Sequence, residues 1–156
     1  MIRGLHHCAI VTEDLERSVA FYCSHFGFER VLESGWERGY ARVDAIVGLK
    51  DTAARFVMIG NGTDFIEIFH YSSPERAPET RLHQANDPGF AHICFEVDDI
   101  DAEYKRLLAV GMHFHTPPPL GSPNGVRSTY GRDPDGNIVE LLQIIDANHP
   151  FRRKET

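Results

Sequence analysis

Two stretches of the chain share the same pattern. Each has a short apolar run, then an acidic turn and then an amphipathic segment. Residues 7–22 read HCAIVTEDLERSVAFY, and residues 92–107 read HICFEVDDIDAEYKRL, 85 residues further along and without a gap. Each stretch opens with a histidine beside a short apolar run and then turns acidic. A repeated supersecondary unit of this kind predicts two related modules in one chain.

Each repeat continues with the spacing of an amphipathic helix. Apolar side chains three or four positions apart fall on one helical face, and here they are Leu15, Val19, Tyr22 and Phe26 in the first repeat and Ile100, Tyr104 and Leu107 in the second. Acidic pairs at residues 13–14 and 98–99 suit the positive N-terminal end of each helix. Gly27 and Gly111 stand where we expect each helix to end.

Runs typical of strands follow each predicted helix. The expected strands are residues 28–32, 54–59 and 64–71 in the first half and 112–115, 126–131 and 137–144 in the second. Asn61-Gly62 and the Asp-Pro-Asp-Gly of residues 133–136 predict tight turns. Each half therefore reads β-α-β-β-β. Residues 38–49 fit no element clearly, and residues 43–49 suit either a short helix or a loop over a site.

The domain organisation follows from the repeat. We expect a single domain over residues 1–145, with module one at about 4–71, a linker at about 72–88 and module two at about 89–145. Residues 146–156 read as a polar C-terminal tail. A chain of 156 residues with 42% hydrophobic residues can bury a core without a disulfide or a metal.

Composition and charge exclude several classes of function. The net charge of −7 argues against nucleic acid as a partner, because phosphate binding needs a clustered basic surface and the densest basic run is only residues 152–154. No apolar run approaches the length of a membrane span, and residues 1–7 lack the apolar core of a signal peptide. Three cysteines give no disulfide framework, so we expect a cytoplasmic protein.

Four polar residues recur at matching places in the two halves. His7 and His92 open the first strand of each half, and Glu67 and Glu140 interrupt the last. Side chains alternate along a strand, so each glutamate shares a face with apolar neighbours, where a carboxylate is costly unless paired or metal-bound. Imidazole and carboxylate donors suit one divalent ion of Ni, Co, Zn, Mn or Fe. The pattern alone leaves metal binding and ordinary strand positions both open.

At these residues the sequence resembles the vicinal oxygen chelate (VOC) superfamily, which includes glyoxalase I, methylmalonyl-CoA epimerase, extradiol dioxygenases, fosfomycin-modifying enzymes and bleomycin-resistance proteins. The resemblance covers about residues 4–145 and is carried by LHHCAI at 5–10, DLERS at 14–18, Phe21-Tyr22, GFAHICFEVDDI at 89–100 and DPDGNIVEL at 133–141. It implies an α+β fold in which two βαβββ modules form a curved eight-stranded mixed sheet, the glyoxalase/bleomycin resistance/dihydroxybiphenyl dioxygenase fold. The concave face of that sheet would carry the metal donors.

By motif position, the resemblance implies His7, Glu67, His92 and Glu140 as metal ligands, with His7 rather than His6 in the family register. This donor set is similar to that of bacterial glyoxalase I. Epimerases of the family tend to have Gln at the second position, and extradiol dioxygenases use only the two histidines and the last glutamate. Glu67 therefore favours the lyase and isomerase branch.

The expected function is a glyoxalase I-like lyase or isomerase that moves a proton on a small 2-oxo or 2-hydroxy substrate. A divalent ion would polarise a carbonyl and acidify the adjacent C–H, with Glu140 or Glu67 as the catalytic base. Val11 replaces the family's glutathione-binding Arg, and the segment at residues 38–51 is longer than in compact bacterial glyoxalases, which argues against glutathione as the substrate's carrier. We expect a homodimer, with each metal site built within one chain or across two.

Two alternatives remain open at this stage. One is an Fe(II) ring-cleaving dioxygenase, because Tyr130 precedes Glu140 by ten residues, as the catalytic tyrosine of extradiol dioxygenases does. The other is a metal-free, small-molecule-sequestering protein of the bleomycin-resistance type.

Several residues have a weaker claim to a binding role. Arg55 and Arg127 suit either an anionic substrate or an ordinary surface position. His113 and His115 share one strand face, which suits a second metal site or, as we expect, an exposed surface. A last set, His70, Tyr71 and Cys94, suits either contact with a substrate or an ordinary strand position.

Overall fold

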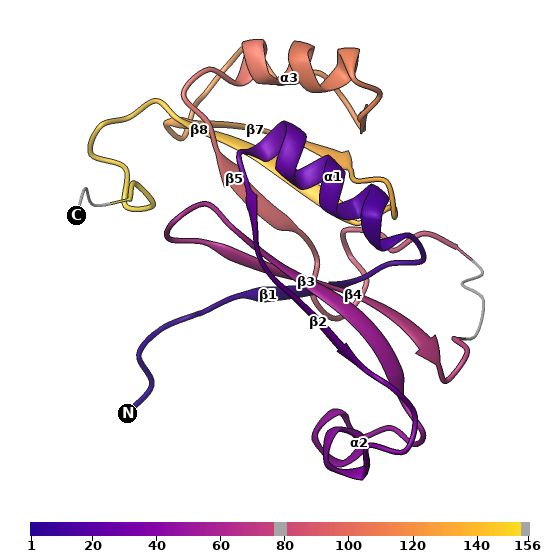
Figure 1. The fold of residues 1–156 in the computed structure, drawn as a ribbon. Coiled ribbons are helices and arrows are strands. Elements are labelled where there is room, and N and C mark those ends of the chain that lie inside the picture. Colours follow the sequence, from indigo (N-terminus) through magenta and orange to yellow (C-terminus); the bar gives the residue numbers. More distant parts are fainter. Residues whose placement is uncertain (77–80, 154–156) are drawn as a thin grey trace. The chain divides into compact units, whose positions relative to one another are not determined.

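A computed structural model describes residues 1–76 and 81–153 of the chain (Figure 1). The chain divides into two compact units, Met1–Thr80 and Arg81–Thr156, here called unit one and unit two. Each unit contains one four-stranded sheet. His7 and Glu67 belong to unit one, and His92 and Glu140 belong to unit two.

Unit one is a mixed sheet with two helices. Its elements in chain order are β1 (Cys8–Val11), α1 (Leu15–Phe26), β2 (Glu29–Trp36), α2 (Ala41–Val47), β3 (Ala53–Gly60) and β4 (Phe65–Ser73). The strand order is β1-β4-β3-β2. The β1 strand runs parallel to β4, and the other neighbours are antiparallel.

Helix α1 forms where the sequence predicts it and covers one face of this sheet. The Asp14 side chain caps the helix by accepting a hydrogen bond of 3.1 Å from the backbone N–H of Arg17. Gly27 ends the helix at a φ of 71°, a conformation that glycine adopts without strain. Val19 and Tyr22 of α1 are fully buried, as are Val57, Ile59 and Ile68 of the sheet. Glu67 therefore lies on the opposite face of β4 from Ile68.

Unit two repeats this plan without the second helix. Its elements are β5 (Ile93–Glu96), α3 (Ile100–Ala109), β6 (His113–Phe114), β7 (Val126–Arg132) and β8 (Ile138–Ile144). The strand order is β5-β8-β7-β6, with β5 parallel to β8. The Asp99 side chain caps α3, and the chain turns at Gly111 with a φ of 92°.

The α+β class and the β-α-β-β-β order of each half are confirmed. The eight strands are hydrogen-bonded as two four-stranded sheets, one in each unit. Unit one adds α2 at residues 41–47, so the short-helix interpretation of the unassigned segment is correct. The expected strand at 28–32 extends to Trp36, because β2 pairs with β3 as far as the Trp36–Ala54 position. The expected strand at 112–115 shortens to two residues.

Part of the predicted linker is ordered by β4 and by a local ion pair. The β4 strand reaches Ser73, whereas residues 77–80 lie outside the described part. The Arg81 guanidinium binds both oxygens of Asp87, at 2.6 and 2.7 Å, and holds the pKa of that carboxyl well below its usual range. Residues 154–156 of the predicted tail, including the last residue of the basic run, are also outside the description.

None of the helices in residues 1–76 and 81–153 is long and apolar enough to cross a membrane.

Candidate metal-binding pairs

In unit one, the parallel pairing of β1 with β4 brings His7 to Glu67. Ala9 is the register partner of Glu67, and His7 precedes it by two residues, just ahead of β1. The His7 Nε2 atom lies 3.3 Å from Glu67 Oε2, with the two side chains 35% and 17% exposed. The other ring nitrogen of His7 lies 2.9 Å from Nδ1 of His6. A polar pair therefore occupies an accessible position on the sheet face that α1 leaves uncovered.

Unit two contains the corresponding pair in the same register. Cys94 is the partner of Glu140 in the parallel β5–β8 ladder, and His92 precedes it by two residues. The His92 Nε2 atom lies 3.0 Å from Glu140 Oε2, with exposures of 30% and 14%. The repeat seen in the sequence is thus a repeat in strand pairing as well.

The separations within both pairs fit two donors on one metal ion. With bonds of about 2.1 Å to nitrogen and oxygen, two donors lie roughly 3.0 Å apart at right angles and about 3.4 Å apart at a tetrahedral angle. A hydrogen bond from imidazole to carboxylate has a similar length, so metal content is the property that separates the two interpretations. Across residues 1–76 and 81–153, no group of three or more His, Cys, Asp or Glu is arranged to hold a metal.

Tyr130 lies beside the pair of unit two. It is the register partner of Glu140 in the β7–β8 ladder, and its ring centroid is 5.1 Å from that of His92. Partial desolvation and the Glu140 carboxylate raise the pKa of the Tyr130 phenol. The phenol is therefore protonated at neutral pH and can donate a hydrogen bond.

Cys94 has the chemistry of an inert thiol. Desolvation, followed by the charge of Glu140, raises its pKa to about 12. The thiolate is the reactive form of cysteine, and it is absent at neutral pH in this environment. Cys94 thus lies beside Glu140 without the properties of a nucleophile.

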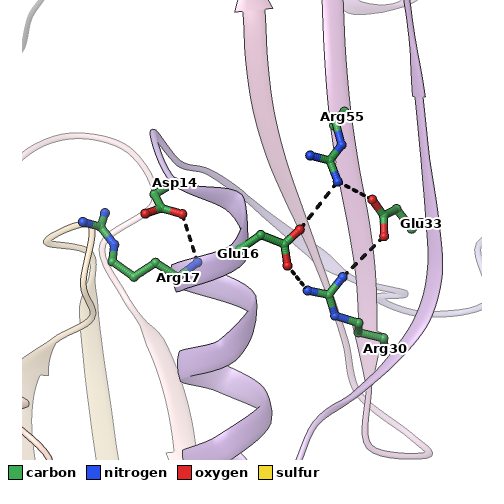
Figure 2. Close-up of polar contacts among 6 residues, drawn as sticks. All are labelled: Asp14, Glu16, Arg17, Arg30, Glu33 and Arg55. Carbon is green, nitrogen blue, oxygen red and sulfur yellow. Dashed lines mark hydrogen bonds and ion pairs between the residues drawn. The ribbon is translucent and has the colours of Figure 1, made fainter.

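Arg55 forms ion pairs with other side chains of unit one, as Figure 2 shows. Its guanidinium pairs with Glu16 and Glu33, and Arg30 pairs with the same two carboxylates, so that four alternating charges form a closed ring. Arg55 also lies on the face of β3 that α1 covers, opposite Glu67. The surface interpretation of Arg55 is therefore correct.

Arg127 likewise forms an ion pair in unit two. Its guanidinium binds both oxygens of Asp101 on α3, at 2.7 and 2.9 Å, and donates to the backbone carbonyl of Pro119 at 2.8 Å. The Asp101 hydrogen bonds raise the pKa of Arg127, and the pKa of Asp101 is lowered in turn. Arg127 thus links strand β7 to helix α3 through an ion pair.

Three further histidines singled out from the sequence lie outside the two His–Glu pairs. His113 and His115 are exposed, as expected, although the His115 ring lies 6.5 Å from Tyr130. His70 is 3.2 Å from the backbone carbonyl of Thr12 and lies on the face of β4 opposite Glu67.

The face that carries Glu67 also holds a cluster of aromatic rings, of which the sequence did not predict Phe56 and Trp36. Phe69 and Tyr71 follow Glu67 at two-residue steps on β4, and Phe56 and Trp36 join them from β3 and β2. Adjacent ring centroids are 5.2 to 6.4 Å apart. The alternation of residues 65–71 was the available signal, but Trp36 lay beyond the predicted end of its strand.

Comparison with known proteins places these features in context. The sequence profile of the Glyoxalase/Bleomycin resistance protein/Dioxygenase superfamily matches residues 4–141. A lactoylglutathione lyase of Pseudomonas putida is 30% identical over 88% of this chain and 83% of its own length. The mitochondrial methylmalonyl-CoA epimerase of Dictyostelium discoideum is 30% identical over 90% of this chain and 78% of its own length. A glyoxalase family protein from Bacillus cereus has a similar structure, with a TM-score of 0.81 and 21% identity over 94% and 97% of the two chains.

Proposed function

Because the chain belongs to the Glyoxalase/Bleomycin resistance protein/Dioxygenase superfamily, we propose that it is a metal-dependent lyase or isomerase. Its substrate is a small molecule with two vicinal oxygens, of the 2-oxo or 2-hydroxy class. The observation that carries this proposal is the recurrence of one His–Glu pair, at 3.3 Å and 3.0 Å, in the same strand register of both units.

The proposal assigns His7, Glu67, His92 and Glu140 as the ligands of one divalent ion. The set of two imidazoles and two carboxylates suits Ni, Co, Zn, Mn or Fe. When bound, such an ion polarises a substrate carbonyl and stabilises the negative charge that forms when the neighbouring C–H loses its proton. The two glutamates are partly exposed, so both are accessible to a substrate.

The chain's own contribution to the reaction is the proton transfer. A glutamate carboxylate within reach of the substrate C–H accepts the proton and returns it to a neighbouring atom. We assign this role to Glu140 or Glu67. We propose that the Tyr130 phenol, which is protonated and lies beside His92, donates a hydrogen bond to a substrate oxygen.

The relatives support this branch of chemistry. Two proteins at 30% identity are named for a lyase and an epimerase reaction, on lactoylglutathione and methylmalonyl-CoA. In this chain Val11 occupies the position expected of a glutathione-binding arginine, and it lies opposite Phe69 as an exposed apolar residue. We therefore propose a substrate without a glutathione carrier.

One observation favours a second candidate, an Fe(II)-dependent ring-cleaving dioxygenase. Tyr130 lies across the β-ladder from Glu140 and beside His92, where a protonated phenol can contact a catecholate. Oxygen consumption with catechol by the iron-loaded protein distinguishes this candidate from the lyase or isomerase.

The test is the metal content of protein purified without a metal-affinity tag, measured by elemental mass spectrometry. We expect about one equivalent of a divalent metal, in keeping with a single four-donor site. The variants His92→Ala and Glu140→Ala should lose it, whereas His113→Ala, which removes an exposed histidine of the same unit, should keep it. A parent protein that stays metal-free after reconstitution contradicts the proposal and favours a ligand-sequestering protein.

A further inference from the structure

The face of unit one that carries Glu67 is apolar and ring-rich beyond the carboxylate itself. Phe69 and Tyr71 follow Glu67 on the same face of β4, and Phe56 of β3 is the register partner of Phe69. Trp36 of β2 contacts Phe56, Phe69 and Tyr71, with centroids 5.8 to 6.4 Å apart. All four rings are half-buried, in contrast to the fully buried aliphatic side chains under α1 on the other face. The rings thus keep accessible surface beside a proposed metal ligand.

Trp36 is held in place by a directional chain of hydrogen bonds. Its indole Nε1–H donates to the hydroxyl of Thr52 at 2.8 Å. That hydroxyl has one proton, which it donates to the Asp44 carboxylate at 2.5 Å. The hydroxyl oxygen is therefore free to accept from the indole.

Asp44 in turn is fixed on helix α2. Its carboxylate also accepts from the backbone N–H groups of Asp51 and Thr52, each at 2.9 Å. The hydrogen bond from the Thr52 hydroxyl, followed by these backbone hydrogen bonds, lowers the pKa of the Asp44 carboxyl, which therefore stays ionised as an acceptor. Thr52 has no exposed surface. The α2 segment, which interrupts the repeated strand order, thus fixes the orientation of the indole ring.

We propose that Trp36, Phe56, Phe69 and Tyr71 form a subsite for a planar, aromatic group of the substrate, with the Asp44–Thr52–Trp36 chain setting its shape. The inference rests on the proposed function, since it places the ring of the substrate next to Glu67. Three observations select a small aromatic group as the occupant. Phe69 occupies the next position after Glu67 on the same face of β4, the indole is held by a hydrogen bond, and Val11, the register partner of Phe69, extends the apolar surface. Aromatic surfaces favour an aromatic partner through offset and edge-to-face contacts.

Trp36 makes the subsite directly observable, because it is the only tryptophan of the chain. Its emission therefore reports on this cluster alone. The probes are mandelate and lactate, which share a hydroxyl and a carboxylate on adjacent carbons and differ only in a phenyl or a methyl group. Their dissociation constants are measured by calorimetry on the metal-loaded protein, while Trp36 emission is followed in parallel.

We expect mandelate to bind roughly tenfold tighter than lactate, from the extra apolar surface that the phenyl group buries, and to change Trp36 emission. Phe56→Leu and Phe69→Leu should reduce this preference at least severalfold and leave lactate binding unchanged. Thr52→Val, which removes the hydroxyl, should alter Trp36 emission and weaken mandelate selectively. Phe90→Leu, at an exposed ring of unit two, is the matched control and should behave as the parent.

Several results would overturn the subsite. Equal affinity of the protein for mandelate and lactate would overturn it. So would a Trp36 emission that does not respond to mandelate but changes with protein concentration, because that result indicates a protein contact on this face. Failure of the proposed function is recognised separately, by the absence of bound metal. In metal-free protein, benzyl alcohol replaces mandelate as the probe, and an emission change lost in Phe56→Leu still supports the ring subsite, whereas an unchanged emission rejects it.

Discussion

Ala9 and Cys94 occupy the same position in the two sheets, 85 residues apart in the chain. Each is the parallel-ladder partner of a glutamate, Glu67 for Ala9 and Glu140 for Cys94. In each unit a histidine two residues earlier reaches the same glutamate, at 3.3 Å and 3.0 Å. The equivalence of the pairs is therefore a property of the strand register.

This equivalence predicts that neither pair suffices for metal binding. The double variants His7→Ala/Glu67→Ala and His92→Ala/Glu140→Ala each leave two of four donors. We expect the metal affinity of both to fall by more than roughly 100-fold, beyond the loss typical of changes around the ligands. Equilibrium dialysis against the metal measures the loss. A double variant that binds metal as tightly as the parent would contradict the four-ligand assignment.

The same two variants determine how many chains build one site. In a homodimer whose sites join modules of different chains, an equimolar mixture unfolded and refolded together regains metal, because one site of each heterodimer has all four donors. In a site built within one chain, the mixture stays metal-free. Native mass spectrometry of the mixture establishes the dimer independently.

The ion pair between Arg127 and Asp101 predicts a pH-dependent contribution to stability. Arg127 lowers the folded-state pKa of Asp101 below its ordinary value of 3.8. The pair therefore stabilises the fold above that pH, and the contribution disappears as the pH falls through the lower folded-state pKa. We expect Arg127→Met to lower the thermal midpoint at pH 7 and to approach the parent in strong acid.

A matched change on α3, the helix that carries Asp101, controls for net charge. Arg106 pairs with Glu103 one turn away, with both side chains considerably exposed. Arg106→Met removes the same charge but an exposed pair, so we expect a smaller shift. Equal shifts for the two variants at every pH would show that Arg127 acts through net charge alone.

The core of unit two offers a comparison of neighbouring leucines. Leu107 has no exposed surface, whereas Leu108 is 48% exposed. Leu107→Ala should cost about 2–5 kcal/mol of unfolding free energy, because it removes buried methyl groups and leaves a cavity. Leu108→Ala should change it by less than about 0.5 kcal/mol. Urea denaturation measures both, and similar losses would contradict the assigned burial.

Gly35 predicts a steric constraint at the edge of unit one. A Cβ atom at this position would lie 2.4 Å from the backbone oxygen of Ala54, which only a shift of β2 away from β3 can relieve. We expect Gly35→Ala to cost about 1–3 kcal/mol and to change the emission of the adjacent Trp36. Gly121→Ala, which has no atom within 4 Å of the new Cβ, is the control for adding a methyl group. Unchanged stability in Gly35→Ala would refute the close approach.

The sequence predicted much of the secondary structure, because helices and strands depend on the types and spacing of neighbouring residues. The apolar stripe and the acidic cap of α1 predict the helix from Leu15 to Phe26, and Gly27 ends it. In β8, the alternation around Glu140 predicts both the strand and a carboxylate that shares a strand face with apolar neighbours. Strand β2 was harder to delimit, because it lies at the sheet edge with most of its side chains exposed and lacks a clear apolar alternation.

The sequence by itself determined the β-α-β-β-β order of the two halves, because this order depends on residue type and spacing within short segments. It also supplied the recurring His and Glu residues that the family resemblance implies as metal ligands. Only the tertiary structure decided which side chains meet. Pairing of β1 with β4 joins residues 60 positions apart into the His7–Glu67 pair. Folding also brings Arg55 and Arg127 into ion pairs with acidic side chains. It brings four aromatic rings together on the sheet face that carries Glu67. Contacts of this kind depend on the register between strands that are far apart in the chain, which local patterns do not encode.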